Sequence, residues 1–137
     1  MNSWRVAGIA FLGAGALFVG ISSSAQEATP AVTFKADIKP IIKKYCLPCH
    51  AEDNYNPSEL SLDSYQLLME GGKHGSPVVP GKPDESLLIK KLSGTADFGD
   101  QMPLAKKRND GEVKQTHLTA QEMKTLREWI AQGAKEK

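Results

Sequence analysis

Apolar residues recur at helical spacing in several short stretches of the chain, and polar or Gly- and Pro-rich segments separate these stretches. In the first stretch, residues 34–45, five side chains fall on one helical face: Phe34, Ile38, Ile41, Ile42 and Tyr45. Two starting points fit this pattern. Either Asp37 caps the helix and Pro40 lies in its first turn, or the helix begins at Phe34 and bends at Pro40.

Two further short helices are predicted in the middle of the chain. The segment "DSYQLLMEGG" is expected to have Asp63 or Ser64 as its cap and to end at Gly71. The segment "DESLLIKKL" has Asp84 as its expected cap and carries apolar residues along one side. The stretch between them, "GGKHGSPVVPGKP", is too rich in Gly and Pro for long regular structure.

The last helix has the clearest pattern. Thr119 and Glu122 have the spacing of a capping box, and Gly133 is a suitable C-terminal stop. The apolar stripe consists of Met123, Leu126, Trp129 and Ile130. A long irregular stretch, residues 93–117, precedes this helix, and loops of that length are usually functional. Because strand signals are nearly lacking, we predict an all-α fold of several short helices and long loops.

The first residues have the composition of an export signal. The short, positively charged start "MNSWR" precedes the apolar run "VAGIAFLGAGALFVGI", and Ala25 is placed for cleavage after it. The run is shorter than the roughly 20 apolar residues of a membrane-spanning helix, so we expect cleavage rather than retention as an anchor. We therefore expect a signal peptide at 1–25, a flexible lead-in at 26–33 and a periplasmic domain at 34–137. The membrane is involved only if the first segment is retained.

Charge and composition change this picture in two respects. The formal net charge is +1, from 17 basic and 16 acidic residues, which does not provide the concentrated basic face that nucleic-acid binding needs. Aromatic residues make up only 7% of the chain, and a small domain with few large side chains has difficulty filling its core. A buried cofactor would relieve that shortage.

The two cysteines of the chain lie three residues apart in "KKYCLPCHAED", and a histidine directly follows the second. This C-x-x-C-H arrangement is the attachment signal for c-type haem. On a helical turn, positions three apart face the same way, so Cys46 and Cys49 can both bond to the vinyl groups of one porphyrin. His50 would then lie under the ring as the proximal ligand of the iron. Haem of this type is attached in exported proteins, which agrees with the predicted signal peptide.

Three other uses of the cysteines are less favoured. A structural disulfide would close a very small loop, for which the stabilisation is smallest, although an oxidising compartment permits it. A thioredoxin-like dithiol needs βαβ patterning, which this sequence lacks. A zinc site of Cys46, Cys49, His74 and His117 would need two histidines that do not form a local pair. A non-haem metal or dithiol module is therefore the weaker alternative to haem.

The axial position opposite His50 has five candidate ligands: Met69, Met102, Met123, His74 and His117. Met69 and Met123 lie on apolar helical faces and are better explained as core residues. Met102 lies in the irregular segment "FGDQMPL", where Pro103 disfavours helix at the preceding residue. We favour Met102, and a histidine or an open position is the alternative. Methionine opposite histidine raises the reduction potential.

The order of these motifs resembles the monohaem planctomycete-type cytochrome c domain of the class I cytochrome c group. The resemblance covers residues 34–134 and rests on "DIKPIIKKYCLPCH", "LSLDSYQLLMEGG", "GSPVVPGKPDESLLIKKL", "QMP" and "LTAQEMKTLREWIAQGA". It implies a small cytochrome c fold wrapped around one covalently bound haem c, with its first and last helices packed together. It also implies Cys46 and Cys49 as thioether sites, His50 as proximal ligand and Met102 as distal ligand.

These observations predict an electron carrier rather than an enzyme, because an iron with six ligands has no position for a substrate. The alternative is a five-coordinate haem that binds a gas or a peroxide, as in a sensor or a peroxidase. Redox partner proteins are expected. Lys43, Lys44, Lys73 and the basic run at 106–108 would favour a partner with an acidic surface.

Overall fold

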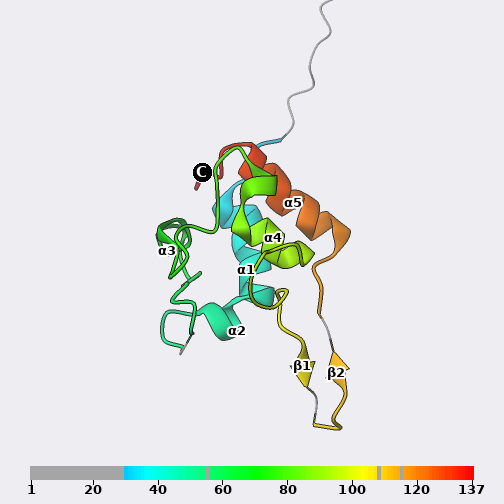
Figure 1. Ribbon diagram of the computed structural model, residues 1–137. Helices are drawn as coiled ribbons and strands as arrows, with labels where there is room; N and C mark the ends of the chain where they lie inside the picture. The colour runs from blue at the N-terminus through cyan, green and yellow to red at the C-terminus, as the bar shows by residue number, and fades with distance from the viewer. Residues whose placement is uncertain (1–29, 55, 108, 115) are drawn as a thin grey trace, which may run out of the picture.

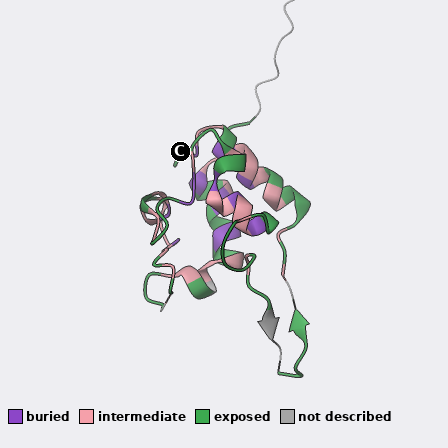
Figure 2. Cartoon of the chain, in the orientation of Figure 1, coloured by how far each residue is buried: buried purple, intermediate pink, exposed green. Residues whose placement is uncertain are grey.

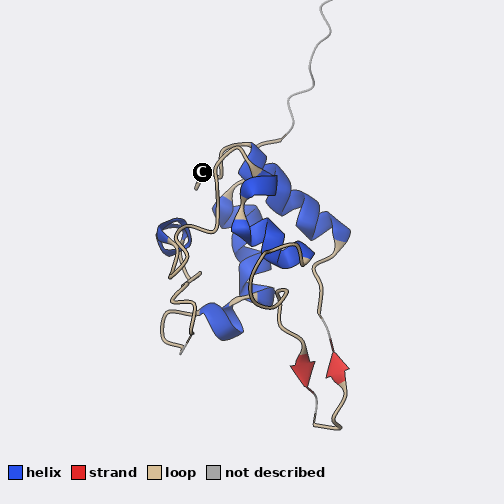
Figure 3. Cartoon of the chain, in the orientation of Figure 1, coloured by secondary structure: helices blue, strands red, loops and turns tan. Residues whose placement is uncertain are grey.

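The computed structural model describes residues 30–137 except 55, 108 and 115, so the predicted signal peptide and the first half of the lead-in lie outside the described residues. The described part is mainly helical, as predicted (Figure 3). In chain order its helices are a π-helical turn η1 (Phe34–Ile38), α1 (Lys39–Tyr45), α2 (Leu47–His50), α3 (Tyr65–Glu70), a 3₁₀ turn η2 (Pro83–Glu85), α4 (Leu87–Ser93) and α5 (Ala120–Ala131).

The first helical segment begins at Phe34, the second of the two predicted starting points. Thr33 is the cap, because its side-chain oxygen accepts a hydrogen bond from the Ala36 N–H over 3.3 Å. Asp37 also contacts the cap residue, since its Oδ2 accepts a hydrogen bond from the Thr33 N–H over 2.8 Å. The π-helical turn then passes into α1, and Pro40 is tolerated in the first turn of α1.

The two middle helices differ in how well local chemistry predicts their start. α3 is capped by Ser64, whose hydroxyl accepts from the Leu67 N–H over 3.1 Å, and it ends at Gly71, which has a φ of 81°. The prediction of Asp84 as the cap of the next helix was wrong. The chain forms η2 there, and α4 begins only after Ser86. Asp84 instead forms an ion pair with Arg127 of α5.

α5 has the predicted capping box at its N-terminus. The Thr119 hydroxyl accepts from the Glu122 N–H over 3.1 Å, and Glu122 Oε2 accepts from the Thr119 N–H over 2.8 Å. These two hydrogen bonds confirm the predicted capping box. The helix ends at Ala131, two residues before the predicted stop at Gly133.

The buried core lies where the first helices meet α4 and α5 (Figure 2). Trp129 is fully buried, and its Nε1 donates to the Lys135 carbonyl over 2.8 Å. Its ring centroid lies 6.0 Å from that of Phe34, which in turn lies 5.5 Å from that of Tyr65. Trp129 thus acts as a core anchor between the two ends of the domain.

The start of the domain lies beside the end of α5 (Figure 1), as the resemblance implies. The Val32 N–H donates to Gln132 Oε1 over 2.8 Å, and Gln132 Nε2 donates to the Pro30 carbonyl over 3.2 Å. At the other end of α1, Lys44 Nζ and the Tyr45 hydroxyl donate to the Glu122 carboxylate over 2.9 and 2.8 Å. Both ends of α5 therefore hold the segment that precedes the cysteine motif.

Part of the predicted irregular stretch is a small hairpin. Strands β1 (Lys106–Lys107) and β2 (Val113–Lys114) pair antiparallel and extend away from the helices (Figure 1). Two-residue strands are too short to show an alternating pattern, which explains why the sequence did not predict them. In the described part of the chain, no helix is long and apolar enough to cross a membrane.

Candidate functional site

The three residues of the cysteine motif lie on one turn. The N–H groups of Cys49 and His50 both donate to the Cys46 carbonyl, over 3.0 and 2.8 Å. Pro48 lies in the first turn of α2, where its missing N–H removes no hydrogen bond. The turn therefore brings both thiols and the imidazole into one short segment.

The two thiols differ in environment. Both are free, but Cys46 packs against the core whereas Cys49 is exposed. Burial raises the pKa of the Cys46 thiol to about 11, and the neighbouring Cys49 adds to the shift. Cys46 therefore forms a thiolate less readily than an ordinary cysteine, so this thiol is not activated as a nucleophile.

His50 is oriented through its Nδ1, which lies 3.0 Å from the Leu60 carbonyl oxygen. Because a carbonyl only accepts, Nδ1 carries the hydrogen in this contact. Nε2 is then the nitrogen that keeps a lone pair. Histidines that ligate metals commonly donate their other ring N–H in this way, which fixes the tautomer and the ring orientation.

The loop that supplies the Leu60 carbonyl is itself held firmly. Asn56 Nδ2 donates to the same carbonyl over 2.8 Å, and the Leu62 N–H donates to the His50 carbonyl over 2.9 Å. A side chain at Gly72 would have its Cβ 2.4 Å from the Ser58 carbonyl oxygen, so only glycine fits there. Asn56, Leu60 and Gly72 were not predicted from the sequence as supports of His50. The only available signal was the Gly71–Gly72 pair, which is typical of a close backbone approach.

Met102 lies on the loop after α4, far from the motif in sequence. Its side chain is partly buried and packs against the same core as Cys46. Its N–H donates to the Lys91 carbonyl over 2.9 Å, and the Met102–Pro103 peptide bond is cis. The thioether therefore comes from a loop whose backbone is anchored to the end of α4.

The other candidate ligands fall into two groups, core-packing methionines and exposed histidines. Met69 packs against the core from α3, and Met123 lines a groove beside α5. His74 is exposed in a turn, with its ring centroid 4.4 Å from that of Phe98, and His117 is also exposed. The two methionines thus pack against the same core as Met102, whereas the two histidines are exposed.

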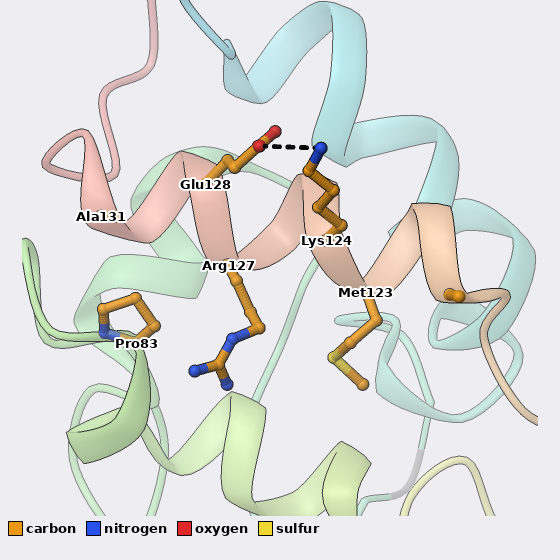
Figure 4. Close-up of a pocket in the computed structure, with 7 residues that line it drawn as sticks. Pro83, Met123, Lys124, Arg127, Glu128 and Ala131 are labelled. Atoms are coloured by element: carbon orange, nitrogen blue, oxygen red, sulfur yellow. Dashed lines mark ion pairs between the residues drawn. The ribbon is translucent and has the colours of Figure 1, made fainter. Parts of the chain in front are cut away.

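The groove that Met123 lines has a volume of about 500 Å³ and is shown in Figure 4. Its walls come from α5 and from η2: Pro83, Ala120, Met123, Lys124, Arg127, Glu128 and Ala131. None of Cys46, Cys49, His50 and Met102 lines it, so the groove is separate from the cysteine motif. Among the residues described, no three His, Cys, Asp or Glu side chains are grouped to hold a metal ion, which leaves the zinc alternative without a ligand set there.

The residues present fit a c-type haem. They provide two free thiols three apart on one turn, an imidazole with Nε2 available, and a thioether on an anchored loop. Several apolar side chains that pack against the core are only partly buried and would gain from an apolar ligand: Leu47, Leu60, Leu88, Met102 and Leu118. The incomplete burial of these apolar side chains agrees with the shortage of large side chains in the sequence.

Residues 46–103 match the protein-family model described as Planctomycete cytochrome C. The match confirms the predicted resemblance. It begins at Cys46 and ends one residue after Met102, so the segment includes all four predicted haem residues. Similarity to a cytochrome c domain over these residues supports a haem c protein with redox partners, and it suggests an electron carrier. Searches of curated proteins and of solved structures found no match.

Proposed function

We propose that this protein is a periplasmic electron carrier with one covalent haem c. Cys46 and Cys49 would form the thioether bonds, and His50 and Met102 would be the axial ligands. The observation that carries the proposal is the match over 46–103 together with the Nδ1 contact of His50 to the Leu60 carbonyl. The first supplies the family, and the second supplies an imidazole whose Nε2 is ready to ligate.

The bound haem would supply a one-electron couple, and the side chains of the chain would set its conditions. His50 would be held in one tautomer by the Leu60 carbonyl, which makes Nε2 more basic as a ligand. Met102 would close the remaining axial position, and its thioether would raise the reduction potential. An iron closed on both sides does not bind substrate, which is why we propose a carrier and not an enzyme.

A redox partner with an acidic docking surface is part of the proposal. Lys43 and Lys73 are exposed, and Lys43 lies in the last turn of α1, three residues before Cys46. Lys44 is less suitable than the sequence suggested, because it is paired with Glu122 over 2.9 Å. The side chains of the run at 106–108 lie outside the description. Charge of this kind speeds encounter with a partner more than it strengthens the complex.

The proposal is tested by expressing the full chain with its N-terminal segment in a bacterium that attaches haem c, and purifying the periplasmic fraction. We expect one haem per chain by intact mass, a mature protein that begins after Ala25, and a ferric spectrum with a sulfur-to-iron charge-transfer band. The Cys46→Ala/Cys49→Ala variant is the matched control and should carry no covalent haem. A colourless wild-type protein with two reactive thiols would contradict the proposal.

A further inference from the structure

The loop that carries Met102 returns to the last turn of α4, and most of its contacts there involve one residue, Lys91. The Lys91 ammonium donates to the carbonyls of Phe98 and Asp100, the latter over 3.4 Å. It also lies 4.4 Å from the centroid of the Phe98 ring. A single side chain thus binds both the backbone and the ring of the loop that leads to Met102.

The backbone of Lys91 holds the other side of the same loop. Its carbonyl accepts from the Met102 N–H over 2.9 Å. Next to it, Gln101 Nε2 donates to the Leu92 carbonyl over 2.9 Å. The loop from Phe98 to Met102 is therefore closed onto the end of α4 by contacts to two consecutive residues of that helix.

Space around the ammonium group is limited as well. A Cβ added at Gly99, where φ is 59°, would lie 2.9 Å from Lys91 Nζ. The loop therefore passes close over the Lys91 side chain. The cation also lies at the C-terminal end of α4, where the helix dipole favours a positive charge.

We infer that Lys91 is a positioning residue for Met102: by closing the 98–102 loop onto α4, it keeps the Met102 thioether at the axial position. The inference rests on the proposed function, because it assumes that Met102 is a ligand. Without the side-chain contacts of Lys91, the irregular loop has more conformations available. Binding of Met102 to the iron must then restrict a more mobile loop, at a larger cost in conformational entropy. The fraction of protein with Met102 displaced from the iron would then rise.

Imidazole added to the ferric holoprotein measures that fraction, because it binds only where Met102 has left. Its apparent affinity scales with the open fraction. For Lys91→Met we expect an affinity for imidazole about tenfold higher than in the wild type, with a weaker sulfur-to-iron band at the same haem content. Lys90→Met is the matched control, since no contact of the Lys90 side chain with the loop is found in the described part, and it should leave the affinity unchanged.

Two further variants separate positioning from a general loss of structure. In a Met102→Ala background the axial position is already open, so Lys91→Met should have no additional effect on imidazole affinity. Lys91→Gln removes the same ammonium contacts to the Phe98 and Asp100 carbonyls with a smaller change in polarity, and it should raise the affinity in the same direction as Lys91→Met; it carries the test should Lys91→Met not fold.

The outcomes distinguish the inference from the proposed function. A wild-type ferric spectrum without the sulfur-to-iron band would overturn Met102 as a ligand, and the positioning role of Lys91 with it. A wild-type band together with equal imidazole affinities for Lys91→Met and Lys90→Met would overturn the inference alone. An equal effect of Lys91→Met with and without Met102 would also overturn it.

Discussion

The two proposed axial residues are held in different ways. His50 lies in the cysteine motif itself, and its ring is oriented by a carbonyl only ten residues further along the chain. Met102 lies on an irregular loop, and its backbone is anchored to the carbonyl of Lys91 in α4, the helix that precedes this loop. Both residues are thus held by contacts ten or eleven residues away along the chain, but on the proximal side the contact orients the ring itself, whereas on the distal side it holds the backbone of the loop. We therefore expect the proximal side to govern haem attachment and the distal side to govern ligation and potential.

The largest predicted effects are on the covalent attachment of haem and on the ligation of its iron, and two variants should affect them separately. Cys46→Ala/Cys49→Ala should abolish covalent haem, because no thioether bond remains possible. Met102→Ala should keep one covalent haem per chain and lose the sulfur-to-iron band. Intact mass and the ferric spectrum of both variants measure the two effects. If Met102→Ala also lost its covalent haem, the division between the two sides would be wrong.

A second effect concerns the support of His50. Gly72→Ala would place a Cβ 2.4 Å from the Ser58 carbonyl oxygen, in the loop that ends at Leu60. We expect it to lower the free energy of unfolding of the holoprotein by about 3 kcal/mol, as for other forced overpacking.

Gly75→Ala is the control for that change. Gly75 has a φ of 77° but open space around it, so alanine there should cost only about 1 kcal/mol of backbone strain. Denaturant unfolding followed by circular dichroism measures both variants. Equal losses at the two positions would show that close packing against the Ser58–Leu60 segment is unimportant.

A smaller effect concerns pH and the link between α1 and α5. Hydrogen bonding to the Thr119 backbone, with further contacts to Lys44 and Tyr45, lowers the pKa of Glu122 from 4.5 to about 2. The ionised Glu122 carboxylate therefore stabilises the fold at pH values above 4.5, the ordinary pKa of a glutamate. This contribution to stability is lost as the pH falls from 4.5 towards 2.

Glu122→Gln should lower the free energy of unfolding by about 1 kcal/mol at neutral pH, an amount kept small by solvent screening. The difference from the wild type should shrink as the pH approaches 2. Glu128→Gln, which loses only an exposed pair with Lys124, should show almost no change. Thermal unfolding across this pH range provides the measurement, and a difference that did not vary with pH would contradict the role of the charge.

The smallest effect concerns the proposed docking charge. Replacing Lys43 and Lys73 with Gln should slow oxidation of the ferrous protein by hexacyanoferrate(III) by about twofold at low salt, with the difference disappearing at high salt. Stopped-flow kinetics at several ionic strengths measure this rate. If the wild-type rate did not depend on salt concentration, electrostatic steering by Lys43 and Lys73 would be excluded.

Local chemistry allowed much of this molecule to be predicted from its sequence. Ser64, Thr119 and Glu122 cap their helices as expected, since the partners of a cap lie within three residues. Asp84 failed as a predicted cap because its partner is Arg127, 43 residues away, and such a competing contact leaves no local signal. The support of His50 by Leu60 and of the Met102 loop by Lys91 comes from nearer in the chain, but it lies in irregular loops, which have no periodic pattern that would predict such contacts.

A crystal structure of the exported holoprotein tests the central claim most directly. We predict one haem bonded to Sγ of Cys46 and Cys49, with Nε2 of His50 and the thioether sulfur of Met102 on opposite sides of the iron. The His50 Nδ1 contact to the Leu60 carbonyl should be kept. A protein without haem, a zinc ion or disulfide at the two cysteines, or an iron without Met102 would contradict the claim.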